Sequence, residues 1–304
     1  MTQAPAPRLS LQAWLLILLL SFPWAGSFIF FRLLAHEIPS LTVAFGRVAI
    51  AGIALFAALS LSGQRLSVRW RHFLVLGLLN NVIPFSLFAW AEIRITSGEA
   101  AILNATAPIF TGIVLHVFGA ERLTALRTIG AAIGFIGVAV LTGADALALD
   151  GDFAARLACL GAALSYGFTA LWARRIGPTA PMQAATAQCL CSTLILAPLV
   201  LLIDHPWALP SPSPTAWGAL FGIALVSTAA AYVVFFRIVA LAGAANVMLV
   251  TFLVPVSTLA MGAIFLGEPV LPRAVAGMAL IAMGLAAIDG RIFGRWRRQR
   301  PSAD

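Results

Sequence analysis

Charge is scarce in this sequence. Only 10% of its 304 residues are charged, 61% are apolar, and none of the nineteen basic residues is a lysine. A soluble domain carries about 25% charged residues, which keep its surface hydrated. The composition therefore excludes an ordinary water-soluble protein, and it predicts that lipid forms most of the surroundings of the chain.

Residues that perform chemistry are also few. The three cysteines, Cys159, Cys189 and Cys191, all lie inside apolar runs, where a thiol behaves as a small hydrophobe. The four histidines are scattered, and the chain has no HExxH, GxSxG or phosphate-binding glycine motif. An intramembrane enzyme needs a metal cluster, a nucleophile with its base, or paired carboxylates. We therefore expect no enzyme activity, no metal and no cofactor.

The formal net charge of +8 could indicate nucleic-acid binding, but the arginines fall in short segments between apolar runs. We therefore expect no nucleic-acid partner and name the lipid bilayer as the main one. None of those segments is long enough to form a soluble domain, which disfavours a receptor or scaffold. No obligatory protein partner is predicted.

Long apolar runs are what the sequence has instead. A helix needs about 20 residues to cross a hydrocarbon core of roughly 30 Å, and its backbone groups must bond within their own segment. The first run is too long for a signal peptide, and no small-residue cleavage pattern closes it. The sequence predicts an all-α integral membrane protein with ten transmembrane helices, at about 11–34, 40–61, 72–92, 97–118, 124–143, 153–174, 182–203, 215–238, 243–267 and 271–290.

The arginines predict how these helices are oriented. With the N-terminus in the cytoplasm, fourteen arginines fall in cytoplasmic segments and four in external ones, while Arg47 lies inside a run. Cytoplasmic segments of membrane proteins carry the excess of arginine. We therefore expect both termini to face the cytoplasm.

Two proline-to-glutamate stretches indicate an internal repeat. Pro108 lies thirteen residues before Glu121, and Pro255 lies thirteen residues before Glu268. The pattern predicts a five-helix repeat at 1–147, a second at 148–290, and a basic cytoplasmic tail at 291–304. The same shift of 147 residues, without a gap, also aligns Trp70 with Trp217, Phe118 with Phe265, and Gly130, Gly137 and Gly143 with Gly277, Gly284 and Gly290.

An odd number of helices in each repeat means that the second repeat enters the membrane from the opposite side. The two repeats are therefore predicted to be inverted, related by a pseudo-twofold axis in the membrane plane. Many secondary transporters use this architecture for alternating access, with the substrate near the midplane between the halves. The expected fold is two inverted five-helix repeats around a central cavity.

The segments that close the two repeats, "GAERLTALRTIGAAIGFIGVAVL" (119–141) and "LGEPVLPRAVAGMALIAMGLAAI" (266–288), resemble the EamA family of the drug/metabolite transporter superfamily. The resemblance covers about 11–290. It implies a cavity lined mainly by the first, third, fourth, sixth, eighth and ninth helices. It also implies a multi-pass protein of the bacterial inner membrane that exports amino acids, including aromatic or other apolar ones, or related small metabolites.

Polar residues inside membrane spans are costly and therefore mark candidate sites. Pro84 frees a carbonyl in the third helix and can bend it. The alternative is that such polar side chains only hydrogen-bond neighbouring helices. In the third helix and its repeat partner, the eighth, amide and hydroxyl groups lie beside aromatic rings, and we predict substrate binding by Asn80, Asn81, Phe85, Trp90, Thr228 and Tyr232.

The fourth and ninth helices carry Pro108 and Pro255, which are predicted hinges or kinks. Asn104, near Pro108, could bind the amino or carboxyl group of a zwitterion, although kinks that serve packing alone explain the prolines equally well. Trp24 and Tyr166, in the first and sixth helices, could form an aromatic wall for apolar substrate side chains.

Arg47 lies about two turns inside the second helix and is assigned a structural or gating role. It could clamp a substrate carboxylate, since arginine binds that group through two hydrogen bonds. The resemblance, however, implies that the second helix is peripheral to the cavity. A structural arginine, paired with Glu37 or bonded to carbonyls, is therefore favoured.

Glu121 and Glu268 receive the same structural or gating assignment. Both are predicted to start a helix, where a carboxylate interacts favourably with the positive end of the helix dipole. The alternative is a gating ion pair with Arg122 or Arg273.

None of the eleven acidic residues is predicted near the middle of a span. A transporter that exchanges protons for lipophilic cations would be expected to hold a buried carboxylate there. Its absence favours a zwitterionic amino acid as the small-molecule substrate, and leaves a multidrug or lipophilic-cation exporter of the same superfamily as the alternative.

Overall fold

The computed structural model of the protein describes residues 10–119, 125–142, 151–176, 179–242 and 250–289. Within these ranges it consists of helices and the turns that join them, and it contains no strand. The all-helical prediction is confirmed. The helices, in chain order, are α1 (Leu11–Leu34), α2 (Ser40–Leu61), α3 (Trp70–Gly77), η1 (Leu78–Val82), α4 (Ile83–Ala91), α5 (Ser97–Asn104), α6 (Ala107–Val117), α7 (Ala125–Thr142), α8 (Gly151–Ala173), α9 (Pro181–Leu199), η3 (Val200–Asp204), η4 (Pro206–Ala208), α10 (Pro214–Phe221), η5 (Gly222–Ala230), α11 (Ala231–Ala242), α13 (Val250–Met261), η6 (Gly262–Leu266) and α14 (Pro272–Asp289).

In the part of the chain that the structure describes, seven helical segments are long and apolar enough to cross a membrane, and three further apolar helices are shorter. Each overlaps one of the ten apolar runs of the sequence. The long segments are Leu11–Leu34, Ser40–Leu61, Trp70–Ala91, Ser97–Val117, Asp152–Ala173, Pro181–Asp204 and Pro214–Phe235, and the shorter ones are Thr128–Leu141, Leu253–Leu266 and Pro272–Ala287.

Local sequence explains where several helices begin. The side chains of Ser10, Thr96 and Ser213 each accept a hydrogen bond from the backbone N–H three residues later, which caps α1, α5 and α10. Proline stands in the first turn of α9 and α10, where its missing N–H leaves no helical hydrogen bond unmade.

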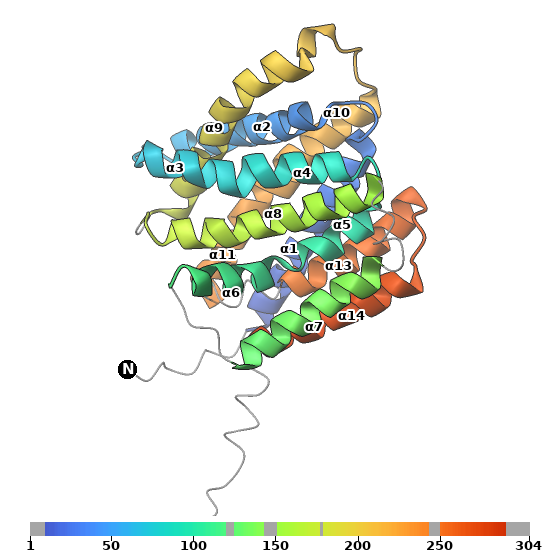
Figure 1. Cartoon of the computed structure of the whole chain (residues 1–304). Helices are drawn as coiled ribbons and strands as arrows, with labels where there is room; N and C mark the ends of the chain where they lie inside the picture. Colours follow the sequence, from blue (N-terminus) through green and yellow to red (C-terminus); the bar gives the residue numbers. More distant parts are fainter. Residues whose placement is uncertain (1–9, 120–124, 143–150, 177–178, 243–249, 290–304) are drawn as a thin grey trace, which may run out of the picture.

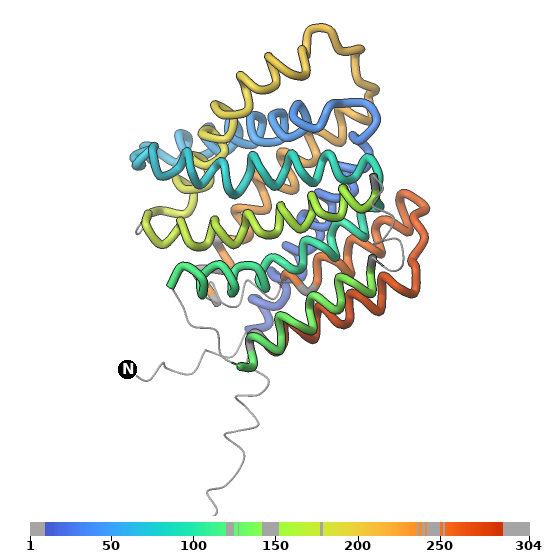
Figure 2. Tube along the Cα trace, viewed as in Figure 1, coloured from blue at the N-terminus to red at the C-terminus, as the bar shows by residue number. Residues whose placement is uncertain are grey.

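Helices of the two halves pack against each other in matching pairs (Figures 1 and 2). The helix α1 contacts α13, and its repeat partner α8 contacts α6, the repeat partner of α13. The helix α2 contacts α9, and α7 lies beside α14 along one edge of the bundle. Each of these contacts between the halves therefore has a counterpart, or is its own counterpart, when the two halves exchange roles.

Glycines make this relation visible in the α7–α14 pair. A Cβ on Gly277 would lie 2.8 Å from the carbonyl oxygen of Gly137, and a Cβ on Gly284 would clash with the carbonyl oxygen of Gly130. A shift of 147 residues converts Gly130 into Gly277 and Gly137 into Gly284. The two contacts are therefore copies of each other, as expected when a twofold axis passes between two helices.

Both copies of the third helix of the repeat widen into a π-helical segment. In the first half η1 precedes Pro84, which cannot donate a backbone hydrogen bond, and in the second half η5 occupies the corresponding stretch. Position 231, which corresponds to Pro84, is alanine, so proline cannot be the common cause. Segments of this kind are frequent at functional sites.

The two predicted proline hinges differ. The run 97–118 is divided into α5 and α6, and Pro108 stands in the first turn of α6, whereas Pro255 lies inside α13 without ending it. At the break the Thr106 hydroxyl donates to the carbonyl oxygen of Leu103 at 2.6 Å. The corresponding residue in the second half is Leu253, which has no such donor.

Replacing Gly277 by alanine tests the close approach of α7 and α14. The new methyl group would lie 2.8 Å from a backbone oxygen that cannot rotate away. We expect the free energy of unfolding to fall by about 1–3 kcal/mol, measured by thermal denaturation in detergent. Gly218→Ala is the matched control because nothing lies within 4 Å of its Cβ position. Equal stability of the two variants would contradict the close packing.

Candidate functional site

A hydrogen-bonded group of buried amides and hydroxyls joins the two halves within their membrane spans. Asn81 of η1 donates to the Ser192 hydroxyl at 3.0 Å, and Gln188 of α9 donates to the Asn81 carbonyl oxygen at 3.2 Å. Gln188 also donates to the hydroxyl oxygen of Tyr232 in α11 at 2.9 Å. We call Asn81, Gln188, Ser192 and Tyr232 the amide network. Asn81 of the third predicted helix and Tyr232 of the eighth are thus linked through Gln188.

The approach of α9 to η1 depends on a glycine. A Cβ at Gly77 would lie 2.8 Å from Ser192 Oγ. Ser192 donates to the Gly77 carbonyl at 3.2 Å and to the Gln188 carbonyl of its own helix at 2.7 Å. The missing side chain at Gly77 therefore lets a backbone carbonyl in the first half meet a hydroxyl of the second.

Arg47 of α2 lies in the interior of the bundle with 6% of its surface exposed. Its Nε donates to Thr228 Oγ1 at 2.9 Å and its Nη2 to Ser27 Oγ at 3.3 Å. The guanidinium carbon lies 3.7 Å from the ring centre of Phe85 and 5.3 Å from that of Phe31. This side chain therefore contacts α1, α4 and η5.

Glu37 does not supply the counter-charge that was expected for Arg47. Its carboxylate accepts hydrogen bonds from the backbone N–H and the hydroxyl of Ser213, both at 2.8 Å, and these bonds hold the pKa of Glu37 below its usual value. No ion pair joins Arg47 to an acid anywhere in the described ranges.

The cost of burying Arg47 and the stabilisation by the groups around it are of similar size. Removing a cation from water costs several kcal/mol even after the protein relaxes. Hydrogen bonds to a charged group return about 1.5–3 kcal/mol each, and stacking on an aromatic ring about 0.5–2 kcal/mol. A carboxylate would return more, because it would neutralise the charge.

The remaining predicted site residues are distributed as follows. Asn80 donates to Asn81 at 3.4 Å and thus joins the amide network. Tyr166 is partly buried against the main apolar core, and Trp24 stacks on Phe235 with ring centres 5.8 Å apart. Trp90 is 38% exposed and makes no contact with the amide network that the described ranges record.

Asn104 lies at the break between α5 and α6. Its side-chain carbonyl oxygen is buried and accepts no hydrogen bond from any group whose position is described. An orphaned acceptor of this kind is uncommon in a folded protein, and it suits a donor that arrives with a ligand. The break that Pro108 introduces therefore leaves both a bent chain and an unused acceptor.

Gln188, Ser192 and Ser27 were not predicted as site residues. A signal for Gln188 was present, since an amide in the interior of an apolar span is costly wherever it lies. It went unused because the resemblance implies that the seventh helix, here α9, does not line the cavity.

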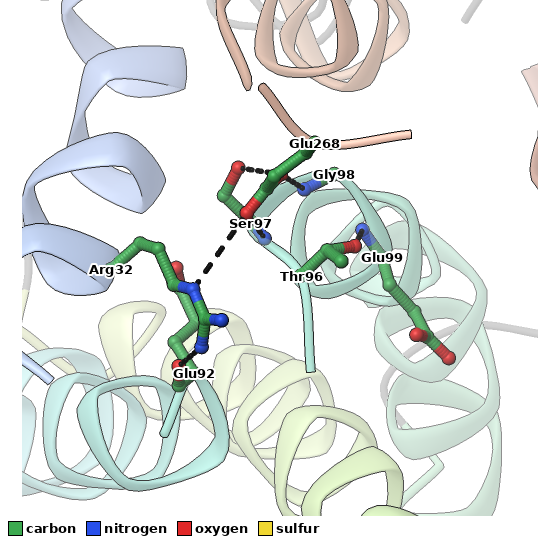
Figure 3. Close-up of polar contacts among 7 residues, drawn as sticks. All are labelled: Arg32, Glu92, Thr96, Ser97, Gly98, Glu99 and Glu268. Atoms are coloured by element: carbon green, nitrogen blue, oxygen red, sulfur yellow. Dashed lines mark hydrogen bonds and ion pairs between the residues drawn. The ribbon is translucent and has the colours of Figure 1, made fainter. Parts of the chain in front are cut away.

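A second polar cluster closes one end of the bundle, where α1 and α4 end and α5 begins (Figure 3). The Glu268 carboxylate accepts hydrogen bonds from the backbone N–H and hydroxyl of Ser97, at 3.0 and 2.6 Å, and from the N–H of Gly98 at 3.5 Å. Arg32 lies 3.9 Å from the same carboxylate. Arg32, Glu92, Ser97, Gly98 and Glu268 form what we call the end cluster.

Glu268 thus lies at the positive end of a helix dipole, as predicted, but of α5 rather than of the helix that follows it in sequence. Its cation is Arg32, whereas Arg273 was the one named in the gating alternative. Contact between α5 of the first half and a residue of the second makes Glu268 a link between the halves. Its repeat partner Glu121 lies outside the described residues.

Glu92 is the buried acid of the end cluster. It has no exposed surface, and neither carboxylate oxygen accepts a hydrogen bond within the described part of the chain. Its backbone carbonyl accepts a hydrogen bond from Arg32 Nη1 at 2.6 Å, and its backbone N–H donates to the Phe88 carbonyl at 3.0 Å. The sequence placed Glu92 at a helix end and gave no sign that it is enclosed.

Titratable side chains do not gather elsewhere in a way that would hold a metal. Among the residues that the structure covers, no group of three or more His, Cys, Asp or Glu lies close enough to bind one.

Comparisons with known proteins agree with this fold. The pattern of the EamA-like transporter family matches residues 11–143 and again residues 154–288. A crystal structure of another protein superposes with a TM-score of 0.67 at 19% sequence identity, over 93% of this chain and 99% of that one.

Several curated relatives are transporters. A probable terminal-alkyne amino-acid exporter of Streptantibioticus cattleyicolor is 28% identical over 95% of this chain and 97% of its own length. The uncharacterized transporter YoaV of Bacillus subtilis is 24% identical over 86% of this chain and 91% of its own. The uncharacterized inner membrane transporter YedA of Escherichia coli K12 is 29% identical over 69% and 70%.

The two glutamates of the end cluster are expected to respond in opposite ways to the loss of charge. Glu268→Gln removes the anion that three donors and Arg32 share, so we expect the free energy of unfolding to fall by about 1–3 kcal/mol. Glu92→Gln exchanges a buried carboxyl without a hydrogen-bond partner for a neutral group of the same shape, so stability should be unchanged or higher. Thermal denaturation in detergent measures both, and a stronger loss from Glu92→Gln would contradict these two roles.

Proposed function

Because the chain belongs to the EamA-like transporter family, we propose that it is a secondary transporter that exports zwitterionic amino acids or closely related small metabolites. The export crosses a bacterial inner membrane by alternating access. Ten membrane helices in two inverted five-helix repeats, with both termini in the cytoplasm, form the framework of this proposal. The matched pairs of contacts between the halves support it.

The amide network is the observation that carries the proposal. It places uncharged hydrogen-bonding groups and aromatic rings between the two halves, inside their membrane spans. Groups in that position contact a small polar solute from both halves at once, so a rocking motion of one half exposes the solute first to one side and then to the other. An amino acid suits such a site because its backbone groups are polar and its side chain can be apolar.

The end cluster supports the same cycle. Glu268 bridges the start of α5 and the end of α1, and a bridge between the halves at one end of the bundle keeps that end closed. Opening that end requires its hydrogen bonds to break. Water outside the membrane can bond to the groups that these hydrogen bonds leave free. Breaking them therefore costs much less than breaking hydrogen bonds at the midplane.

Glu92 gives the multidrug or lipophilic-cation alternative its best support. A buried acid without a hydrogen-bond partner in the described ranges is the kind of group that such exporters would need. Glu92 lies beside Arg32 and Glu268 at the end of the bundle, however. Arg47 is a charged side chain buried within the membrane spans, and its positive charge would repel a cationic substrate. The amino-acid proposal is therefore preferred.

Counterflow into proteoliposomes, measured with a panel of labelled amino acids, tests the proposal directly. Accumulation of at least one amino acid against an unlabelled internal pool is expected. Failure of every amino acid together with uptake of cationic dyes would replace the proposal with the cation-exporter alternative.

Asn81→Leu is expected to reduce counterflow by at least about tenfold, because it removes the hydrogen bonds to Ser192 and from Gln188, worth about 1–3 kcal/mol together, along with the longer one from Asn80. Thr186→Val is the matched control. Thr186 is also fully buried in a membrane span, but its hydroxyl bonds to the Met182 carbonyl of its own helix. Full activity of Asn81→Leu, in protein that remains folded by gel filtration, would remove Asn81 from the site.

A further inference from the structure

Arg47 holds a positive charge inside the protein and uses little of its capacity to bond. A guanidinium group has five N–H donors. Two of them are used, one toward Thr228 and one toward Ser27, so three remain without a partner in the described ranges. The residue is nevertheless 94% enclosed, since 6% of its surface is exposed.

The other buried arginine of the described chain shows the contrast. Arg156 of α8 is 4% exposed, and its Nε donates to the Glu99 carboxylate at 2.6 Å. Its charge is thus neutralised inside the protein, although its Nη1 is buried without a hydrogen-bond partner in the described ranges. Arg47 has only hydroxyl groups and aromatic rings in the corresponding place, and no acid of the described ranges neutralises it.

The surroundings of Arg47 fix its position without blocking its donors. The ring centres of Phe85 and Phe31 lie 3.7 and 5.3 Å from the guanidinium carbon. Both rings therefore restrict the movement of the group. Thr228, which accepts from Nε, is itself anchored by donating to the Ile223 carbonyl in η5 at 2.9 Å. A planar donor group fixed in this way is suited to a carboxylate, which accepts two parallel hydrogen bonds from it.

We propose that Arg47 is the carboxylate receptor of the transport site, an inference that rests on the proposed function and names what the site recognises. The carboxylate of the solute binds to the unused N–H donors and supplies the missing negative charge. The ammonium group has no matching acid near Arg47 in the described ranges, so it is accepted but not required. Monocarboxylates that lack an amino group are therefore ligands, while amides, amines and permanent cations are not.

Competition between four compounds with the same side chain tests the inference in the counterflow assay. These are the amino acid, its 2-oxo acid, its amide and its decarboxylated amine. The amino acid and the oxo acid are expected to inhibit at similar concentrations, whereas the amide and the amine should need at least about tenfold more, the cost of losing a charge-assisted contact. Equal inhibition by the amino acid and its amide would overturn the inference.

Arg47→Gln should abolish the difference between acid and amide. The matched control is the double variant Arg156→Gln with Glu99→Gln, which removes a buried arginine together with its partner and should keep the difference. Retention of the difference in Arg47→Gln would contradict the inference. Should that variant fail to fold, Arg47→Lys keeps the charge but not the planar pair of donors, and it should weaken binding of the acid by at least about tenfold. Unweakened binding would count against the inference.

A binding measurement separates this inference from the proposed function. Thermal denaturation of the purified wild-type protein is followed with propionate and benzoate, and with propionamide and benzamide. Stabilisation by the acids but not by the amides supports the receptor even where no amino acid is transported, and equal effects of acids and amides oppose it even where transport occurs.

Discussion

The two halves of this protein meet through hydrogen bonds between polar side chains. Asn81 bonds to Gln188, Arg47 to Thr228, and Ser97 to Glu268, and each of these pairs joins the first half to the second. Lipid tails are as apolar as leucine, so apolar burial does little to bring helices together within a bilayer. Hydrogen bonds between the halves therefore contribute more to their arrangement than they would in water, and they also supply the groups that a solute can bind.

Close packing performs the same task where no polar side chains are present. Along α7 and α14 the glycines bring backbone against backbone, in two contacts that the repeat makes equivalent. The bundle thus has an apolar, tightly packed contact at this edge and polar contacts between α2, η1, α9 and η5. Motion of one half against the other disturbs the polar contacts at less cost, because a solute or water can replace them, whereas nothing replaces the contact of two glycine backbones.

Much of this could be predicted from the sequence. The apolar runs indicated the helices, and the repeat of proline, glutamate and glycine indicated the relation between the halves. The amides of the third helix indicated the amide network because an Asn inside a membrane span is costly unless a partner or a ligand bonds to it. The features that could not be predicted depend on the direction in which a side chain points from its helix axis. The orientation of Arg47, the role of Gln188 and the enclosure of Glu92 all depend on which neighbour faces each side chain, and the π-helical segments shift that direction further.

The free-energy cost of a buried arginine charge differs between the empty protein and the protein that holds a carboxylate. While one side of the site is open, water hydrates the Arg47 guanidinium, and its charge costs little. Closing the site without a ligand strips that water and leaves the cation with hydroxyl groups and rings alone. Closing the site around a carboxylate instead takes an arginine–carboxylate pair, which has no net charge, out of water. A ligand shifts a conformational equilibrium only by its differential affinity for the two states, and here the difference lies in the charge itself. It follows from the proposed role of Arg47 that the loaded transporter changes sides more readily than the empty one.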